Sequence, residues 1–306
     1  MSNKSGARWI LLGPAVALEV AILFLPLAYI TFRSFYDWNP ASSSDFIGFE
    51  NYYWVLTDPE FWEIIWNQIF YLMGLPLWVL APLVVAYLLR ENVWNAALFR
   101  SIYFLPAVMS PAIVGLVFRS LLATDGTLNA VLDNLGLESW SQPWLTGREF
   151  VKPVVIIMVL WAGFGTGVLI FTSAFAAVPR DLFEAAKLDG AKFWQQFFYI
   201  AVPSIKNTVI LWTMFQIVAI FLFMFGWIYV LTGGGPGLAS ATMDFSIYQQ
   251  FVRFGFYGTA AAQTVVLVIS IILVPLSGYA ALAVLRWLRN QVTPRRRYAD
   301  LAEARA

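Results

Sequence analysis

The side chains of this 306-residue sequence that could do chemistry are few, because it contains no histidine and no cysteine. The apolar segments also hold no pair of carboxylates, so acid–base and metal chemistry lack their usual residues. We therefore expect no catalytic residue, no metal site and no cofactor on this chain. What the apolar segments do hold is amides, a hydroxyl and aromatic rings, which could hydrogen-bond to or stack on a passing solute. These pathway candidates are Gln216, Gln263, Trp161, Trp227, Tyr229 and Thr166.

Each candidate also has a purely structural interpretation. A primary amide in hydrocarbon needs a partner, so Gln216 and Gln263 either face a pathway or bond across packed helices. Packing is the simpler reading of Thr166, and placement in an interfacial aromatic belt is the simpler reading of the tryptophans and Tyr229. Glu19 is an isolated acid in an apolar segment, where it would be an ion site or a hydrogen-bonding group at a helix interface.

The composition identifies the elements that must position these residues. Of the residues, 60% are apolar and 12% are charged, whereas soluble domains have about 25% charged residues. A membrane-crossing helix needs about 20 mostly apolar residues, and six segments qualify. They are Trp9–Phe32 and, approximately, 64–89, 101–122, 153–178, 207–231 and 259–285. The sequence therefore predicts an all-α membrane protein with six transmembrane helices.

Basic residues predict the orientation of these spans. Fourteen of the 19 lysines and arginines lie in the set of loops that includes both ends of the chain, which places both termini in the cytoplasm. The expected organisation is a first helix and external loop (1–62), a transmembrane core (63–286) with the cytoplasmic loop 179–205, and a basic cytoplasmic tail (287–306). A net charge of +1 gives no reason to expect nucleic acid, so the expected surroundings are a lipid bilayer.

The cytoplasmic segment 179–205 has helix signals that a simple connector would lack. Asp181 and Glu184 are spaced as a capping box, Gly190 permits a left-handed turn, and Pro203 stops a second helix. The pattern predicts a helix–turn–helix. It fits a docking element for a cytoplasmic protein, and it equally fits an amphipathic hairpin resting on the membrane.

At these residues the sequence resembles the permease subunits of ABC importers. Glu184-Ala185-Ala186 followed by Asp189-Gly190-Ala191 is similar to their EAA loop. The segment Leu231-Thr232-Gly233-Gly234-Gly235-Pro236 resembles the carbohydrate subgroup, of the maltose and glycerol-phosphate type. The resemblance covers roughly residues 9–286 and favours the docking interpretation.

The resemblance implies a fold, partners and a mechanism. The fold would be that of a type I ABC importer permease in a bacterial or archaeal plasma membrane. Its partners would be a second homologous permease, two ATPase subunits that hold ATP and Mg, and an extracellular solute-binding protein. The ATPase-coupling residues would be Glu184, Ala185, Ala186, Asp189 and Gly190. The chain itself contains no Gly-Lys dipeptide and hence no P-loop, so we expect no ATPase activity from it.

The solute implied is a sugar or related polyol, moved by alternating access. Phe223 and Gly226 stand where relatives place polar groups, so recognition would rely on aromatic stacking or on the partner proteins. Two alternatives remain open at this point. One is an ABC permease for a glycerophosphodiester or a polyamine, and the other is a self-contained secondary transporter, although no internal repeat is evident.

Overall fold

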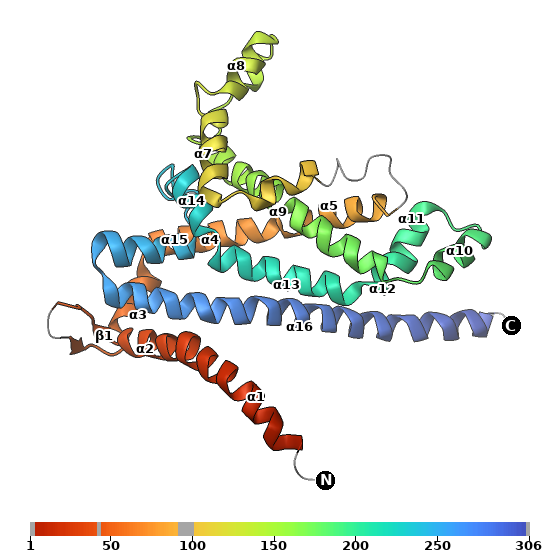
Figure 1. Cartoon of the computed structure of the whole chain (residues 1–306), viewed down its shortest axis with the longest axis horizontal. Helices are drawn as coiled ribbons and strands as arrows, with labels where there is room; N and C mark the ends of the chain where they lie inside the picture. Colours follow the sequence, from red (N-terminus) through yellow and green to blue (C-terminus); the bar gives the residue numbers. More distant parts are fainter. Residues whose placement is uncertain (1–3, 42–43, 91–100, 304–306) are drawn as a thin grey trace. The chain divides into compact units, whose positions relative to one another are not determined.

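The computed structural model describes residues 4–41, 44–90 and 101–303, and its N-terminal part is one long helical segment (Figure 1). This segment consists of α1 (Lys4–Glu19), a π-helix (Val20–Phe24) and α2 (Leu25–Arg33). None of the candidate span Leu12–Arg33 is buried against the rest of the structure. A short antiparallel pair follows, with β1 (Tyr36–Asp37) next to β2 (Asp45–Phe46).

Two long helical segments form the centre of the described bundle. The first consists of α3 (Glu50–Thr57), α4 (Pro59–Met73) and α5 (Leu75–Leu88), and the second is α9 (Arg148–Ala176). Asp58 begins α4 by accepting a hydrogen bond from the Glu60 N–H at 2.9 Å. A Cβ atom on Gly167 of α9 would lie 2.9 Å from Pro82 of α5. Glycine at this position therefore lets the two helices approach closely.

The segment expected to span the membrane over 101–122 is interrupted. Residues 101–104 are helical, a 3₁₀ turn covers Pro106–Val108, and α7 (Pro111–Leu122) begins only after extended backbone at Met109 and Ser110. Proline lacks an N–H group and disfavours helix in the residue before it, which explains the break ahead of Pro111. After α7 come α8 (Thr127–Asn134) and a 3₁₀ turn at Glu138–Trp140.

The segment 179–205 folds as the predicted helix–turn–helix. It consists of α10 (Arg180–Leu188), α11 (Phe193–Gln196), a π-helix (Phe197–Ala201) and α12 (Val202–Ser204). The chain then bends by 76° into α13 (Lys206–Leu222). The expected span 207–231 is also broken, because α13 ends at Leu222 and α14 covers Phe225–Leu231.

The last described elements are α15 (Met243–Tyr248), a π-helix (Gln249–Phe254) and α16 (Tyr257–Glu303). The chain divides into two compact units, Met1–Val265 and Val266–Ala306. Among the described residues, five helices are long and apolar enough to cross a membrane, and there are six if the bent pair Phe193–Ser204 and Lys206–Leu222 counts as one span. The prediction of an all-α membrane protein with about six spans is confirmed.

Candidate functional site

The hairpin α10–α12 is fixed to the bundle by an aromatic core. Phe183, which is buried on α10, belongs to one cluster with Tyr87 of α5, Phe175 of α9 and Phe197. The Tyr87 ring lies 5.6 Å from Phe175 and 5.0 Å from Phe197, centroid to centroid. The guanidinium carbon of Arg90 lies 3.3 Å from the centre of the Phe183 ring, within the range of a cation–π contact. The hairpin is therefore bound rigidly to the ends of α5 and α9.

The turn of the hairpin depends on Gly190. Its φ angle is +76°, in the left-handed region that side chains with a Cβ atom avoid. The Gly190 N–H donates to the Lys187 carbonyl at 3.1 Å, and the Ala191 N–H donates to the Ala186 carbonyl at 2.9 Å. These two bonds are the Schellman pattern of a helix C-terminus. Gln196 adds a bond from its amide to the Ala191 carbonyl at 2.8 Å.

The predicted capping box at the start of this hairpin is wrong. Helix α10 begins at Arg180, with Pro179 at the N-cap and no capping side chain. Pro179 has φ −56° and ψ 133°, so the helix boundary lies two residues before Asp181. Asp181 lies instead in the first turn, where its charge complements the helix dipole.

The residues of the EAA-like segment lie on the outer side of the hairpin. Glu184, Ala185, Asp189 and Gly190 are exposed, and Ala186 is half-buried. Leu188 beside them is 90% exposed. The hairpin thus has a buried aromatic side and an exposed side made of small, acidic and apolar residues.

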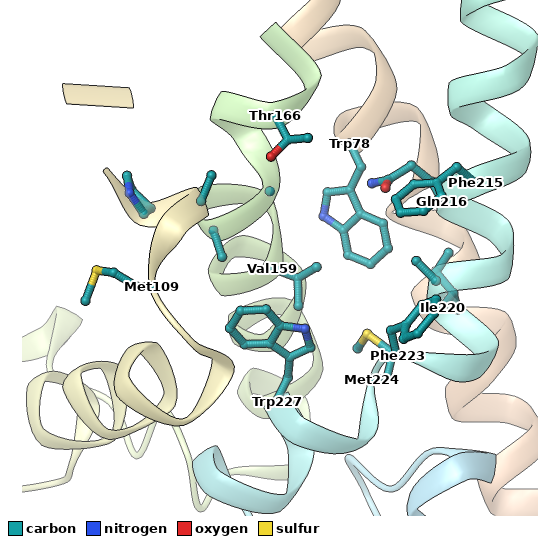
Figure 2. Close-up of a pocket in the computed structure, with 15 residues that line it drawn as sticks. Trp78, Met109, Val159, Thr166, Phe215, Gln216, Ile220, Phe223, Met224 and Trp227 are labelled. Atoms are coloured by element: carbon teal, nitrogen blue, oxygen red, sulfur yellow. The ribbon is translucent and has the colours of Figure 1, made fainter. Parts of the chain in front are cut away.

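A cavity of about 260 Å³, here called the central cavity, lies among α5, α9, α13 and α14. Figure 2 shows Thr166 on α9, Gln216 on α13 and Trp227 on α14 turned toward it. None of the described residues that line it is ionisable. Its labelled lining residues are Trp78, Met109, Val159, Thr166, Phe215, Gln216, Ile220, Phe223, Met224 and Trp227.

The indole of Trp78 is held firmly in the wall of the central cavity. Its Nε1–H donates to the Ile156 carbonyl at 2.9 Å, and its own carbonyl accepts from Trp212 Nε1 at 3.3 Å. In contrast, the Gln216 amide and the Thr166 hydroxyl have no hydrogen-bond partner among the residues that the structure describes. The cavity therefore combines fixed aromatic surface with two polar groups that are free to bind a solute.

Three of the six pathway candidates lie elsewhere. Trp161 is 41% exposed and packs on Phe118 at 5.4 Å. Tyr229 is 44% exposed and packs on Phe225 and Tyr248 at 5.4 and 5.7 Å. Gln263 is buried and accepts a hydrogen bond from the Ser246 hydroxyl at 3.2 Å. Hydropathy locates a span but not the rotation of its helix, which decides the side that each residue faces.

Glu19 lies on the exposed N-terminal helix and does not line the central cavity. Of the two positions expected to be polar in relatives, Phe223 lines the cavity. Gly226 instead faces α7, where an added Cβ would lie 3.3 Å from Pro111. The aromatic replacement at residue 223 is therefore the one that changes the cavity wall.

Buried polar side chains on α4 hold the glycine-rich loop after α14, and the sequence analysis missed them. The Asn67 amide donates to the Leu238 carbonyl at 2.7 Å and to the Ala241 carbonyl at 3.1 Å, and Lys152 donates to its oxygen at 3.1 Å. Tyr71 donates to the Ser240 carbonyl at 3.0 Å. Asn67 lies in an expected span, as Gln216 does. A primary amide in an apolar span needs a hydrogen-bond partner, and this criterion would also have selected Asn67 in the second span.

Asp244 fixes the break between α13 and α14. Its Oδ2 accepts from the Phe225 N–H at 2.6 Å, and its Oδ1 accepts from the Thr242 hydroxyl at 2.5 Å and from the Phe245 N–H at 2.9 Å. Burial raises the pKa of Asp244, and these hydrogen bonds oppose the shift. By capping α14, the carboxylate positions the helix that carries Trp227 into the central cavity.

The bundle of long apolar helices fits a membrane-embedded protein, with a cavity among α5, α9, α13 and α14 and an exposed hairpin. The chain belongs to the family of binding-protein-dependent transport system inner membrane components, whose model matches residues 62–286. The family is that of ABC transporter permeases of the inner membrane, and the segment expected as the transmembrane core, 63–286, nearly coincides with this match.

Among curated relatives, the chain is 32% identical to the probable ABC transporter permease protein YurN of Bacillus subtilis, over 85% of this chain and 92% of that protein. It is 28% identical to the lactose transport system permease protein LacF of Rhizobium radiobacter, over 86% and 90%. Its fold matches a subunit of a bacterial alginate ABC transporter, solved in complex with an alginate pentasaccharide-bound periplasmic protein. That match has a TM-score of 0.74 and 22% identity, and it covers 89% of this chain and 92% of that one.

Proposed function

We propose that this chain is the permease subunit through which an ATP-driven importer moves a neutral sugar or polyol across the plasma membrane. The observation that supports the solute class is the lining of the central cavity. Aromatic rings of Trp78, Phe223 and Trp227 stack on the apolar faces of sugar rings, while Gln216 and Thr166 bond to hydroxyl groups. A relative that carries lactose is consistent with this class.

The same lining argues against the alternatives that the sequence left open. A polyamine needs carboxylates and a phosphate ester needs basic groups, because a buried charge without a partner is costly. No described residue of the central cavity carries either group. Glu19, the ion site that a secondary transporter would use, lies outside the cavity. Neutral hydroxylated solutes therefore fit best.

In the proposed mechanism, the exposed side of the hairpin α10–α12 docks on one of two cytoplasmic ATPase subunits. A second homologous permease completes the pathway, and an extracellular solute-binding protein delivers the sugar. ATP and Mg bind to the ATPase subunits. This chain has no Gly-Lys dipeptide for a P-loop, so it contributes only the movement of packed helices. Both termini and the hairpin then lie on the cytoplasmic side.

The buried side of the hairpin supports this role. Phe183 and Phe197 share a core with Phe171 and Trp212 of the bundle, and Trp212 bonds to the backbone of Trp78 at the cavity. A displacement of the hairpin therefore moves the helices that line the cavity. Movement of a rigid, packed element is the ordinary basis of such coupling.

Uptake by the reconstituted importer tests the proposed solute class. With ATP, the importer should accumulate a neutral sugar from a panel that includes lactose, maltose and arabinose. Glycerol phosphate or spermidine at equal concentration should be transported at least about tenfold more slowly. Equal or faster uptake of either charged solute would refute the proposal.

A further inference from the structure

A second hollow lies at the end of the bundle away from the hairpin. The hairpin packs on Tyr87, near the end of the helical segment 59–88, whereas this hollow lies at Asp58, just before its start. It measures about 500 Å³ and shares no lining residue with the central cavity. Its principal lining residues are Trp54, Asp58, Gln250, Phe256, Thr259 and Gln263. We call it the Gln263 hollow.

Three polar groups of the Gln263 hollow lack partners among the residues that the structure describes. Gln263 is 3% exposed, and its Oε1 accepts from Ser246, but its amide nitrogen has no acceptor. The Gln250 Oε1 atom is buried and accepts no hydrogen bond. The Thr259 hydroxyl has no bond to another described residue. Leaving a buried polar atom unbonded costs about 1–3 kcal/mol, so the buried Gln250 oxygen favours a ligand in this hollow, beside the Gln263 amide and the half-buried Thr259 hydroxyl.

The other two polar side chains of the hollow, Asp58 and Thr57, each make one local hydrogen bond. Asp58 accepts from the Glu60 N–H at 2.9 Å and thereby caps α4, and the Thr57 hydroxyl donates to the Tyr53 carbonyl at 2.7 Å. What the hollow offers is therefore a free donor, a free acceptor and a hydroxyl, next to the exposed rings of Trp54 and Phe256. Amides at the edge of an aromatic surface suit a molecule with both hydroxyl groups and apolar faces.

We infer that the Gln263 hollow binds a neutral polyhydroxylated ligand, at a site separate from the central cavity. Hydroxyl groups both donate and accept, so a single ligand satisfies Gln263, Gln250 and Thr259 together. A sugar and the glycerol part of a lipid headgroup share this chemistry, and the sugar is the ligand expected here. The choice of sugar rests on the proposed function. In the orientation proposed above, the site lies at the outer end of the helices.

The absence of cysteine from the chain permits a direct test. Thr259→Cys replaces one small side chain by another and introduces the only thiol of this chain. In the complete importer, with cysteine-free partners, the rate of alkylation by a small maleimide is followed from the mass of this chain. The measurement is made in lipid nanodiscs and in detergent, with lactose, maltose or arabinose as the probe.

We expect at least one of these sugars to slow alkylation at residue 259 saturably, by roughly threefold or more. Gln263→Met in the same background should weaken the apparent affinity by about two- to tenfold, the cost of one hydrogen bond. Trp66→Cys is the matched control, because Trp66 is 66% exposed on α4 and does not line the hollow. Sugar should leave its alkylation rate unchanged.

Thr166→Cys, in the central cavity, separates this inference from the proposed function. If sugar slowed alkylation at residue 166 and no sugar tested slowed it at residue 259, the second site would be overturned and the proposed function would stand. Protection at residue 259 that Gln263→Met and Gln250→Met both leave intact would also overturn it. The second site would also be overturned if nanodisc lipid alone slowed alkylation at residue 259 and sugar slowed it no further.

Discussion

The hairpin α10–α12 and the central cavity each combine a packed side with an open side, and they differ in the chemistry of the open side. The hairpin buries an aromatic side around Phe183 and leaves its acidic and small residues exposed. The cavity has a fixed wall at Trp78 and leaves Gln216 and Thr166 without partners. In both regions the rigid part is internal, and under the proposed function the open part binds another molecule, a protein at the hairpin and a solute in the cavity.

This difference separates the expected effects of three kinds of substitution. Changes on the exposed side of the hairpin should affect the coupling of ATP hydrolysis to transport more than they affect stability. Changes on its buried side should affect both. Changes in the cavity should affect the solute and leave the assembly of the importer intact.

The largest effect is expected for Glu184→Lys combined with Gly190→Ala. A Cβ at φ +76° costs about 1–2 kcal/mol and distorts the turn, and the charge reversal alters the exposed side. ATP-driven uptake should fall by more than about tenfold, while ATP hydrolysis and the amount of complex in the membrane are retained.

Gly136→Ala is the matched control for that variant. Gly136 also has a positive φ, +73°, with nothing near its added Cβ, but it lies far along the chain from the hairpin. Uptake by this variant should be normal. Normal uptake by the double variant itself would favour a hairpin that simply rests on the membrane.

Phe183→Ala tests the buried side of the hairpin. Removing a fully buried ring should lower the free energy of unfolding by roughly 3–5 kcal/mol, and it removes the contact with Arg90. The midpoint of thermal unfolding of the purified complex and the rate of uptake should both fall. Phe198→Ala, which truncates a ring that is 61% exposed, should change the midpoint of unfolding little. Equal effects of the two variants would contradict the anchoring role of Phe183.

Gln216→Leu tests the cavity. It removes a polar group that has no partner within the described chain, so folding should be unaffected. The KM for sugar uptake should rise by about two- to tenfold, as expected for one hydrogen bond to the solute. Thr213→Val is the control, because its hydroxyl bonds to the Val209 carbonyl of its own helix. An unchanged KM for Gln216→Leu would show that this amide does not contact the solute.

The smallest effect on uptake is expected for Asp244→Asn. The change places an N–H group where the carboxylate now accepts from Phe225 or Thr242, which should cost about 1–3 kcal/mol in stability. Because α14 carries Trp227, the KM should also rise by a few fold. Asp133→Asn, at an exposed position, provides the comparison by thermal unfolding. Equal midpoints for the two variants would contradict a capping role for Asp244.

The sequence predicted the continuous apolar helices well and the broken ones poorly. The expected spans 64–89 and 153–178 correspond to Pro59–Leu88 and Arg148–Ala176, because an uninterrupted apolar helix is visible in hydropathy. The break after Leu222 depends on Asp244, nineteen residues from the N–H group that it caps. No local pattern could reveal that contact.

The turn at Gly190 was predictable because its cause is local, namely the freedom of glycine to adopt a positive φ. The grouping of Thr166, Gln216 and Trp227 could only be proposed, since it depends on how three helices are rotated. The same uncertainty placed Trp161 and Tyr229 among the pathway candidates, although they pack elsewhere. Asn67 was not predicted as a functional residue, because its bonds join α4 to a loop more than 170 residues away in the sequence.

The central claim is that this chain moves a solute only when ATPase subunits drive its hairpin. Radiolabelled sugar uptake into proteoliposomes tests it directly, using this chain with its partner permease and binding protein, with and without the ATPase subunits and ATP. The account predicts accumulation only when both ATPase subunits and ATP are present, and its loss when Glu184 and Gly190 are changed. Accumulation by the permease chains alone would contradict it.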